Sequence, residues 1–192
     1  MRFGRSRETS LLKVSVIQPG ARRHYAVPAS LARAGVLERL YTDFHAEHPP
    51  LRWLDSIVPR AVQPAGLRRL LGRRLPPELP RNRVRDRPIE FIRHALVPGS
   101  RGGSLTRRLL ADLERAPLGP SDVVYTFLIN EDVDVMRRLK ERGATIVHDC
   151  IISPDVGLIM HEEMTRFPGI EPLPDLSEVH AGRARDREKY AV

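Results

Sequence analysis

Short apolar runs alternate with helical patterns at both ends of this chain, and that alternation constrains its fold more than any other feature. Residues 11–17 form a β-rich run that stops at Pro19–Gly20, residues 27, 31 and 34 are apolar at helical spacing, and residues 36–42 form a second run. A strand, loop, helix and strand within about 30 residues have the size of a βαβ unit.

The pattern returns in the second half of the chain. Residues 122–127 and 145–150 read as strands on either side of a helix predicted over 131–142, and a further helix is predicted over 154–166. Alternating strands and helices are typical of a parallel sheet with helices on both faces. The sequence therefore predicts an α/β fold, a Rossmann-like three-layer α/β/α domain with a mostly parallel sheet and strands near 12–17, 38–42, 122–127 and 145–150.

The middle of the chain is different, because nine of the 17 prolines lie between Pro49 and Pro98. Proline lacks an N–H donor and has a fixed φ, so this segment forms neither one long helix nor a central strand. Short helices are predicted over 51–57, 67–71, 88–96 and 105–114. We expect residues 1–192 to form a single domain with an irregular Arg/Pro-rich insertion at about 49–98, and the chain to end inside that domain.

Positive charge is concentrated in the same region. The formal net charge of the chain is +8, and residues 51–108 alone carry a net charge of +10. Every basic residue in that range is an arginine. Arginine binds phosphate groups well, so anionic partners are one interpretation, and a solvated arginine-rich surface is the other. Aromatic residues make up only 5% of the chain and no nucleic-acid-binding module is recognisable, so nucleic acid is a disfavoured partner.

The apolar and cysteine content excludes two classes of protein, those stabilised by disulfides and those that span a membrane. One cysteine excludes a disulfide framework and fits a reducing compartment, and no run of 18 apolar residues predicts a membrane span. The expected location is the cytoplasm, with the inner face of the membrane as a peripheral binding surface.

Three stretches resemble a known family. Residues 23–43 are similar to its first helix and second strand, residues 123–149 to a later strand–helix–strand unit, and residues 161–167 to an acidic pair that follows. Together, about residues 11–48 and 122–190 resemble the N-terminal half of a GT-B glycosyltransferase of family 4 (group 1).

The resemblance implies an activity and its partners. GT-B enzymes have two Rossmann-like domains, and the C-terminal one holds most of the nucleotide-sugar. This chain would be the acceptor-side domain, apparently lacking the C-terminal donor domain and incomplete as an enzyme alone. The expected chemistry is retaining hexosyl transfer from a nucleotide-sugar, without another cofactor, to an unknown sugar or lipid-linked acceptor. The alternative is a basic nucleic-acid-binding protein or a non-catalytic α/β binding protein.

The loop after the first strand is the main candidate site. Gly20, Arg22, Arg23 and His24 follow the strand and precede a helix. Ligands of open α/β sheets bind at such carboxyl ends, where helix N-termini favour anions. The resemblance implies that this loop faces the donor diphosphate and the acceptor. An exposed loop with two surface arginines is the alternative.

Two further residues are candidate acceptor contacts. Asp149 lies at the end of the strand predicted over 145–150, where it can bind a sugar hydroxyl, and Asn130 precedes the helix predicted over 131–142. His148 and Cys150 share one face of the strand, but spacing alone does not make a nucleophile–base pair, so Cys150 is predicted to be a buried core thiol. No metal site is predicted, because the His161-Glu162 pattern lacks a second histidine at residue 165.

A basic amphipathic segment is the candidate membrane contact. Arg68, Arg69, Arg73 and Arg74 alternate with leucines at 67, 70, 71 and 75. Such a segment can lie on an anionic membrane surface, although a surface helix whose arginines extend into water has the same pattern.

Overall fold

The computed structural model describes residues 12–96, 103–118, 122–128, 133–149, 155–166 and 175–191. Its centre is a five-stranded parallel sheet with the order β3-β2-β1-β4-β5. The strands are β1 (Lys13–Ile17), β2 (Leu37–Tyr41), β3 (Val84–Arg85), β4 (Asp122–Thr126) and β5 (Thr145–His148). The predicted fold class and the four predicted strands are confirmed.

The fifth strand, β3, was not predicted. It is only two residues long and pairs with β2 at the edge of the sheet. An edge position is compatible with the surrounding prolines, because an edge strand needs ladder hydrogen bonds on one side only. The Arg/Pro-rich segment therefore contributes a strand to the sheet.

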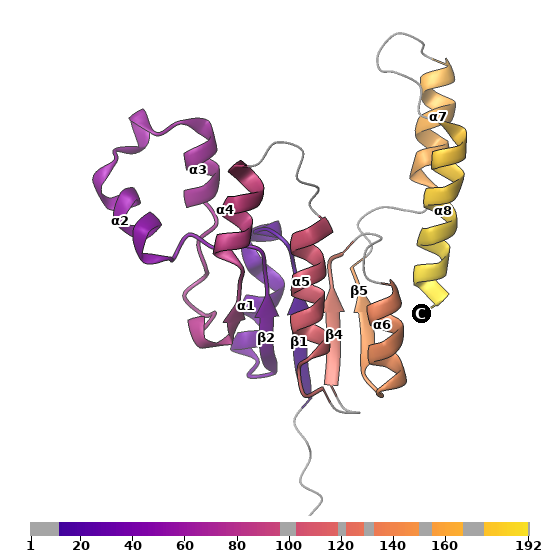
Figure 1. The fold of residues 1–192 in the computed structure, drawn as a ribbon, viewed down its shortest axis with the longest axis horizontal. Coiled ribbons are helices and arrows are strands. Elements are labelled where there is room, and N and C mark those ends of the chain that lie inside the picture. The colour runs from indigo at the N-terminus through magenta and orange to yellow at the C-terminus, as the bar shows by residue number, and fades with distance from the viewer. Residues whose placement is uncertain are drawn as a thin grey trace, which may run out of the picture.

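Helices cover both faces of the sheet (Figure 1), as the alternation of side chains along the strands requires. One face packs Val14, Val16 and Leu40 against α1 (Ala26–Arg33). The other face packs Ile17 and Val124 against α5 (Gly103–Glu114) and α6 (Val133–Glu141). In this way the fold has two apolar cores, one on each side of β1.

The remaining helices lie around this centre. Three short 3-10 helices, η1 (Arg22–Tyr25), η2 (Arg60–Val62) and η3 (Arg81–Arg83), occur with α2 (Pro49–Ile57), α3 (Ala65–Leu71), α4 (Pro88–Leu96), α7 (Val156–Arg166) and α8 (Leu176–Ala191). The α2–α3 segment and the α7–α8 hairpin both extend beyond the carboxyl edge of the sheet (Figure 1). An ion pair between Arg137 and Glu188, 2.8 Å long, joins α8 to α6. Within the described residues, no helix has the length and apolar character that crossing a bilayer requires.

Candidate functional site

The carboxyl edge of the sheet brings together polar residues that follow three neighbouring strands. Gly20 follows β1, the segment Asp43–His48 follows β2, and Asp86 follows β3. The chain order of the strands reverses beside β1, whose two neighbours are β2 and β4. In open parallel sheets, ligands bind outside the carboxyl ends of the strands at such a reversal.

Asp43 fixes the shape of this edge. Its Oδ1 accepts hydrogen bonds from the backbone N–H of Gly20 (2.8 Å) and of Phe44 (2.7 Å), and its Oδ2 accepts one from Arg73 Nη1 (2.7 Å). Gly20 has a φ of +75°, a left-handed conformation that glycine adopts without steric cost. Asp43 thus holds the loop after β1 against the loop after β2.

Arg73 lies in this site, although the sequence assigned it to a membrane surface. Besides its ion pair with Asp43, its guanidinium lies over the Phe91 ring, 5.0 Å from the centroid. Arg74 forms an ion pair with Asp55. Arg68 and Arg69 of the same predicted segment are exposed on α3.

Two histidines share the carboxylate of Asp86. His48 Nε2 is hydrogen-bonded to Asp86 Oδ2, and His45 Nε2 lies 3.4 Å from the same oxygen. The two imidazole rings are stacked, with centroids 4.5 Å apart, and the Phe44 ring also stacks with His48, at 5.8 Å. Burial lowers the pKa of His45; the charge of Asp86 opposes this shift and that of His48 adds to it.

The same three residues place their ligand atoms within 4.8 Å of one another, as a metal site would require. The hydrogen bonds favour a different state. His45 Nδ1 accepts the backbone N–H of Glu47 (3.2 Å), so the proton of the neutral ring is on Nε2, which faces Asp86. A metal at Nε2 would need that proton moved to Nδ1, and the bond to Glu47 would be lost. The arrangement is therefore that of two imidazoles on one carboxylate, which can accept and release protons.

The loop before α1 contacts the site through the side chain of Tyr25. His24 and Tyr25 have φ values of 50° and 58°, so the chain turns sharply there. Tyr25 is fully buried, and its hydroxyl donates a hydrogen bond to the carbonyl oxygen of Phe44 (3.2 Å). Burial raises the pKa of Tyr25 to about 12, so this hydroxyl stays protonated.

The other residues expected from the sequence are placed as follows. His24 is exposed in η1, next to the loop that Asp43 holds. The side chains of Arg22 and Arg23, and the residues Asn130 and Cys150, lie outside the described part of the chain.

Asp149 lies apart from the Asp43 site, because β4 separates β5 from β1. Its backbone N–H donates to the carbonyl oxygen of Thr126 (2.9 Å). Its Oδ2 is buried and has no hydrogen-bond partner among the residues that the structure describes. The structure therefore brings Gly20 together with Asp43 and Arg73, and leaves Asp149 at the opposite edge strand.

Four residues of the site were missed: Asp43, His45, His48 and Asp86. A signal existed for Asp43, which follows the second predicted strand as Gly20 follows the first. The same carboxyl-end rule that selected Gly20 would have found it. Asp86 had no such signal, because its strand was not predicted.

The fold and the site together define a Rossmann-like α/β protein with a polar site at the carboxyl edge of its parallel sheet. No protein family, curated protein or solved structure matches the chain. Its similarity to family 4 glycosyltransferases stays a prediction.

Proposed function

We propose that this chain is the acceptor-side domain of a glycosyltransferase that uses a nucleotide-sugar as donor and a sugar or lipid-linked molecule as acceptor. The observation that carries the proposal is the meeting of Asp43, Arg73, His48 and Asp86 at the carboxyl ends of β1, β2 and β3. This is where the Rossmann architecture binds ligands, and the residues offer both a cation and a proton acceptor.

Each part of the site has a distinct role in this proposal. His48 is 28% exposed, and Asp86 engages its Nε2. Its Nδ1 is then the nitrogen that hydrogen-bonds an acceptor hydroxyl, and Asp86 stabilises the imidazolium when a proton is taken up. When the sugar is transferred, the acceptor oxygen bonds to the anomeric carbon, the nucleoside diphosphate leaves, and the hydroxyl proton is released to a base.

Arg73 and Asp43 shape the place where the donor meets this domain. Arg73 Nη2 lies 3.9 Å from the position that a Cβ on Gly20 would occupy, so the guanidinium borders the loop. A guanidinium in this position can pair with the diphosphate presented by a separate donor domain. Asp43 is occupied by its four donors, the fourth being Thr42 Oγ1 (3.3 Å), and acts as a positioning residue.

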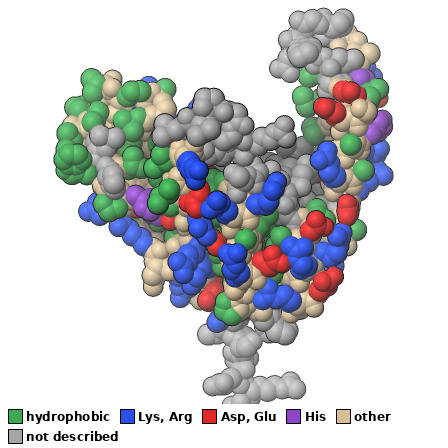
Figure 2. Space-filling view, viewed as in Figure 1, with side chains coloured by type: hydrophobic (Ala, Val, Ile, Leu, Met, Phe, Trp, Pro, Cys, Tyr) green, Lys and Arg blue, Asp and Glu red, His purple; other side chains and the backbone are tan. Residues whose placement is uncertain are grey.

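An exposed apolar surface supports a membrane-proximal acceptor. Trp53, Ile57 and Val62, on and just after α2, are 68%, 54% and 68% exposed. Apolar side chains gather over the α2–α3 part of the molecule (Figure 2), near the exposed Arg68 and Arg69 of α3. Tryptophan and basic residues beside exposed apolar side chains are typical of segments that lie on anionic membranes.

Ligand-observed NMR on the purified chain tests the sugar-binding proposal. We expect members of a panel of mono- and disaccharides to bind, and His48→Gln and Asp86→Asn to weaken that binding. We expect UDP-glucose and GDP-mannose to bind weakly or not at all, because the donor domain is a separate unit in this proposal. The control variant is Asp134→Asn, whose side chain is 81% exposed.

Three results would overturn the proposal. Tight binding of a nucleotide-sugar by the chain alone would make it a donor-binding domain. Steeply salt-dependent binding of duplex DNA would favour the nucleic-acid alternative. Absence of saccharide binding in a chain that melts cooperatively would remove the acceptor role.

Vesicle sedimentation tests the membrane contact separately. We expect the chain to sediment with phosphatidylglycerol vesicles and not with phosphatidylcholine vesicles, and Trp53→Ser to reduce the bound fraction. Equal sedimentation of the variant would show that the α2 surface is not the contact.

A further inference from the structure

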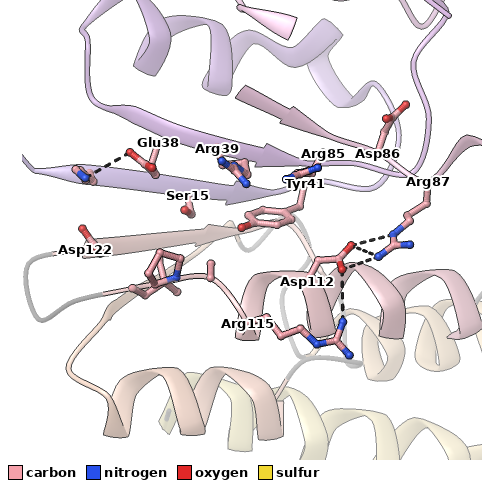
Figure 3. A pocket seen from close by; sticks show the side chains of 14 residues that line it. Ser15, Glu38, Arg39, Tyr41, Arg85, Asp86, Arg87, Asp112, Arg115 and Asp122 are labelled. Carbon is pink, nitrogen blue, oxygen red and sulfur yellow. Dashed lines mark hydrogen bonds and ion pairs between the residues drawn. The ribbon is translucent and has the colours of Figure 1, made fainter. Parts of the chain in front are cut away.

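A second polar site lies on the face of the sheet rather than at its carboxyl edge. It is a groove of about 580 Å³ between β2–β3 and the end of α5. Figure 3 shows Arg39, Arg85 and Tyr41 together on the strand side of the groove, across from Asp112 and Arg115. Cavities of about 300 to 1,000 Å³ are the usual size for small-molecule sites.

Most of the charges that line the groove are paired. Asp112 accepts hydrogen bonds from Arg87 (2.6 Å) and lies 3.7 Å from Arg115, and Glu38 lies 3.7 Å from Lys13. Asp86, at the carboxyl end, is engaged by the two histidines.

Arg39 and Arg85 are different, because neither guanidinium has a carboxylate partner among the residues that the structure describes. Tyr41 is the register partner of Arg85, and Arg39 precedes it by two residues. All three side chains therefore point to the same face of the sheet. Two guanidinium groups without a carboxylate partner in the described part of the chain therefore lie on neighbouring strands, on the same face of the sheet.

The hydroxyl groups of two largely buried residues complete this part of the groove. Ser15 is 1% exposed and Tyr41 is 2% exposed, and both line the groove. Neither side chain makes a hydrogen bond within the described part of the chain. Burial raises the pKa of Tyr41, so its hydroxyl is a neutral donor. Both hydroxyls open into the groove, where they can donate hydrogen bonds to a ligand that accepts them.

We propose that this groove binds the phosphate group of a small phosphorylated ligand, with Arg39 and Arg85 as the cations and Tyr41 and Ser15 as hydroxyl donors. Guanidinium groups form paired, charge-assisted hydrogen bonds with phosphate oxygens, and the hydroxyls satisfy the oxygens that remain. The groove uses other residues than the acceptor site to hold its ligand, and the two sites meet at Asp86, which lines both.

Phosphate titration followed by ¹⁵N NMR and thermal melting tests the proposal at constant ionic strength. We expect inorganic phosphate to raise the melting temperature and to shift the amide signals of Ser15 and Tyr41, whereas chloride does neither. Arg39→Gln and Arg85→Gln should each weaken phosphate binding at least about tenfold, and Tyr41→Phe about fivefold. The variant Arg93→Gln removes the same charge from the exposed surface of α4, so it should bind phosphate like the unchanged chain.

The outcomes separate the proposal from its alternatives. Equal weakening in Arg93→Gln would show a general effect of charge, and absence of any phosphate-dependent shift would overturn the site. Signal shifts that depend on protein concentration instead of phosphate would show that a second copy of the chain covers the groove. Because Tyr41→Phe keeps the ring and its packing, it tests the site even if an arginine variant does not fold.

Discussion

Replacement of Asp43 by asparagine removes a charge from the centre of the candidate site while keeping the shape of the side chain. Asp43 is 11% exposed, and it accepts hydrogen bonds from two backbone N–H groups and from Arg73. A hydrogen bond to a charged group contributes about 1.5 to 3 kcal/mol, against about 0.5 to 1.5 kcal/mol for a neutral one. Loss of about 1 kcal/mol at each of the three bonds amounts to about 3 kcal/mol.

The cost of breaking a buried ion pair supports this magnitude. Breaking a buried ion pair by removing one partner costs about 3 to 5 kcal/mol. Asp43 belongs near the low end of that range, because Arg73 is 27% exposed and water can solvate it in the variant. For a chain of this length, about 3 kcal/mol corresponds to a melting temperature about 6 to 12 °C lower.

Urea denaturation followed by circular dichroism measures the effect. The control is Asp134→Asn, which removes an 81% exposed carboxylate from an ion pair with Arg137 and should change stability by less than about 0.5 kcal/mol. A double-mutant cycle with Arg73→Gln should give a coupling of about 1 kcal/mol or more. A loss below about 1 kcal/mol for Asp43→Asn, or strict additivity with Arg73→Gln, would refute the role assigned to Asp43.

Three further predictions concern the site and the core. Burial lowers the pKa of His45 in the folded chain below its unfolded value of about 6.5. The unfolded chain therefore binds more protons than the folded chain below about pH 6.5, so the free energy of unfolding should fall as the pH drops through that range. His45→Gln should flatten this pH dependence in urea titrations at pH 7.5 and 5.5, and an unchanged slope would exclude His45 as its source. Gly20→Ala should lower the free energy of unfolding by about 1 to 2 kcal/mol, because alanine is strained in the left-handed conformation at φ +75°, even though its Cβ would meet no clash. A neutral effect in urea denaturation would contradict this. Leu109→Ala, at a fully buried position, should cost about 2 to 5 kcal/mol by the same assay, whereas Ile89→Ala, at a 76% exposed position, should stay within about 0.5 kcal/mol.

The regular part of the fold could be predicted because its signals are local. The apolar run that became β1 and the helical spacing at residues 27, 31 and 34 that became α1 can be recognised within a window of a few residues. The same holds for β4, α6 and β5. Proline spacing predicted that residues 49–98 contain short elements, and α2, α3 and α4 have that form.

The sequence pattern of the edge strand β3 is too short to predict a strand. Two residues cannot show an alternating pattern, so Val84–Arg85 becomes a strand only because β2 offers a free edge. Its position also explains why Asp86 was missed, since a residue can be assigned to a carboxyl end only after its strand is known.

The sequence by itself determined that this chain forms a parallel α/β sheet and that the loop at Gly20 lies at the carboxyl edge of that sheet. Only the tertiary structure decided which side chains meet there. Asp86 reaches His48 across 38 residues of sequence because β3 pairs with β2, and Arg73 reaches Asp43 across 30. Periodicity reports which face of an element is apolar, whereas contacts between distant residues depend on which strands pair and on how loops close, and those are set by the energy of the whole fold.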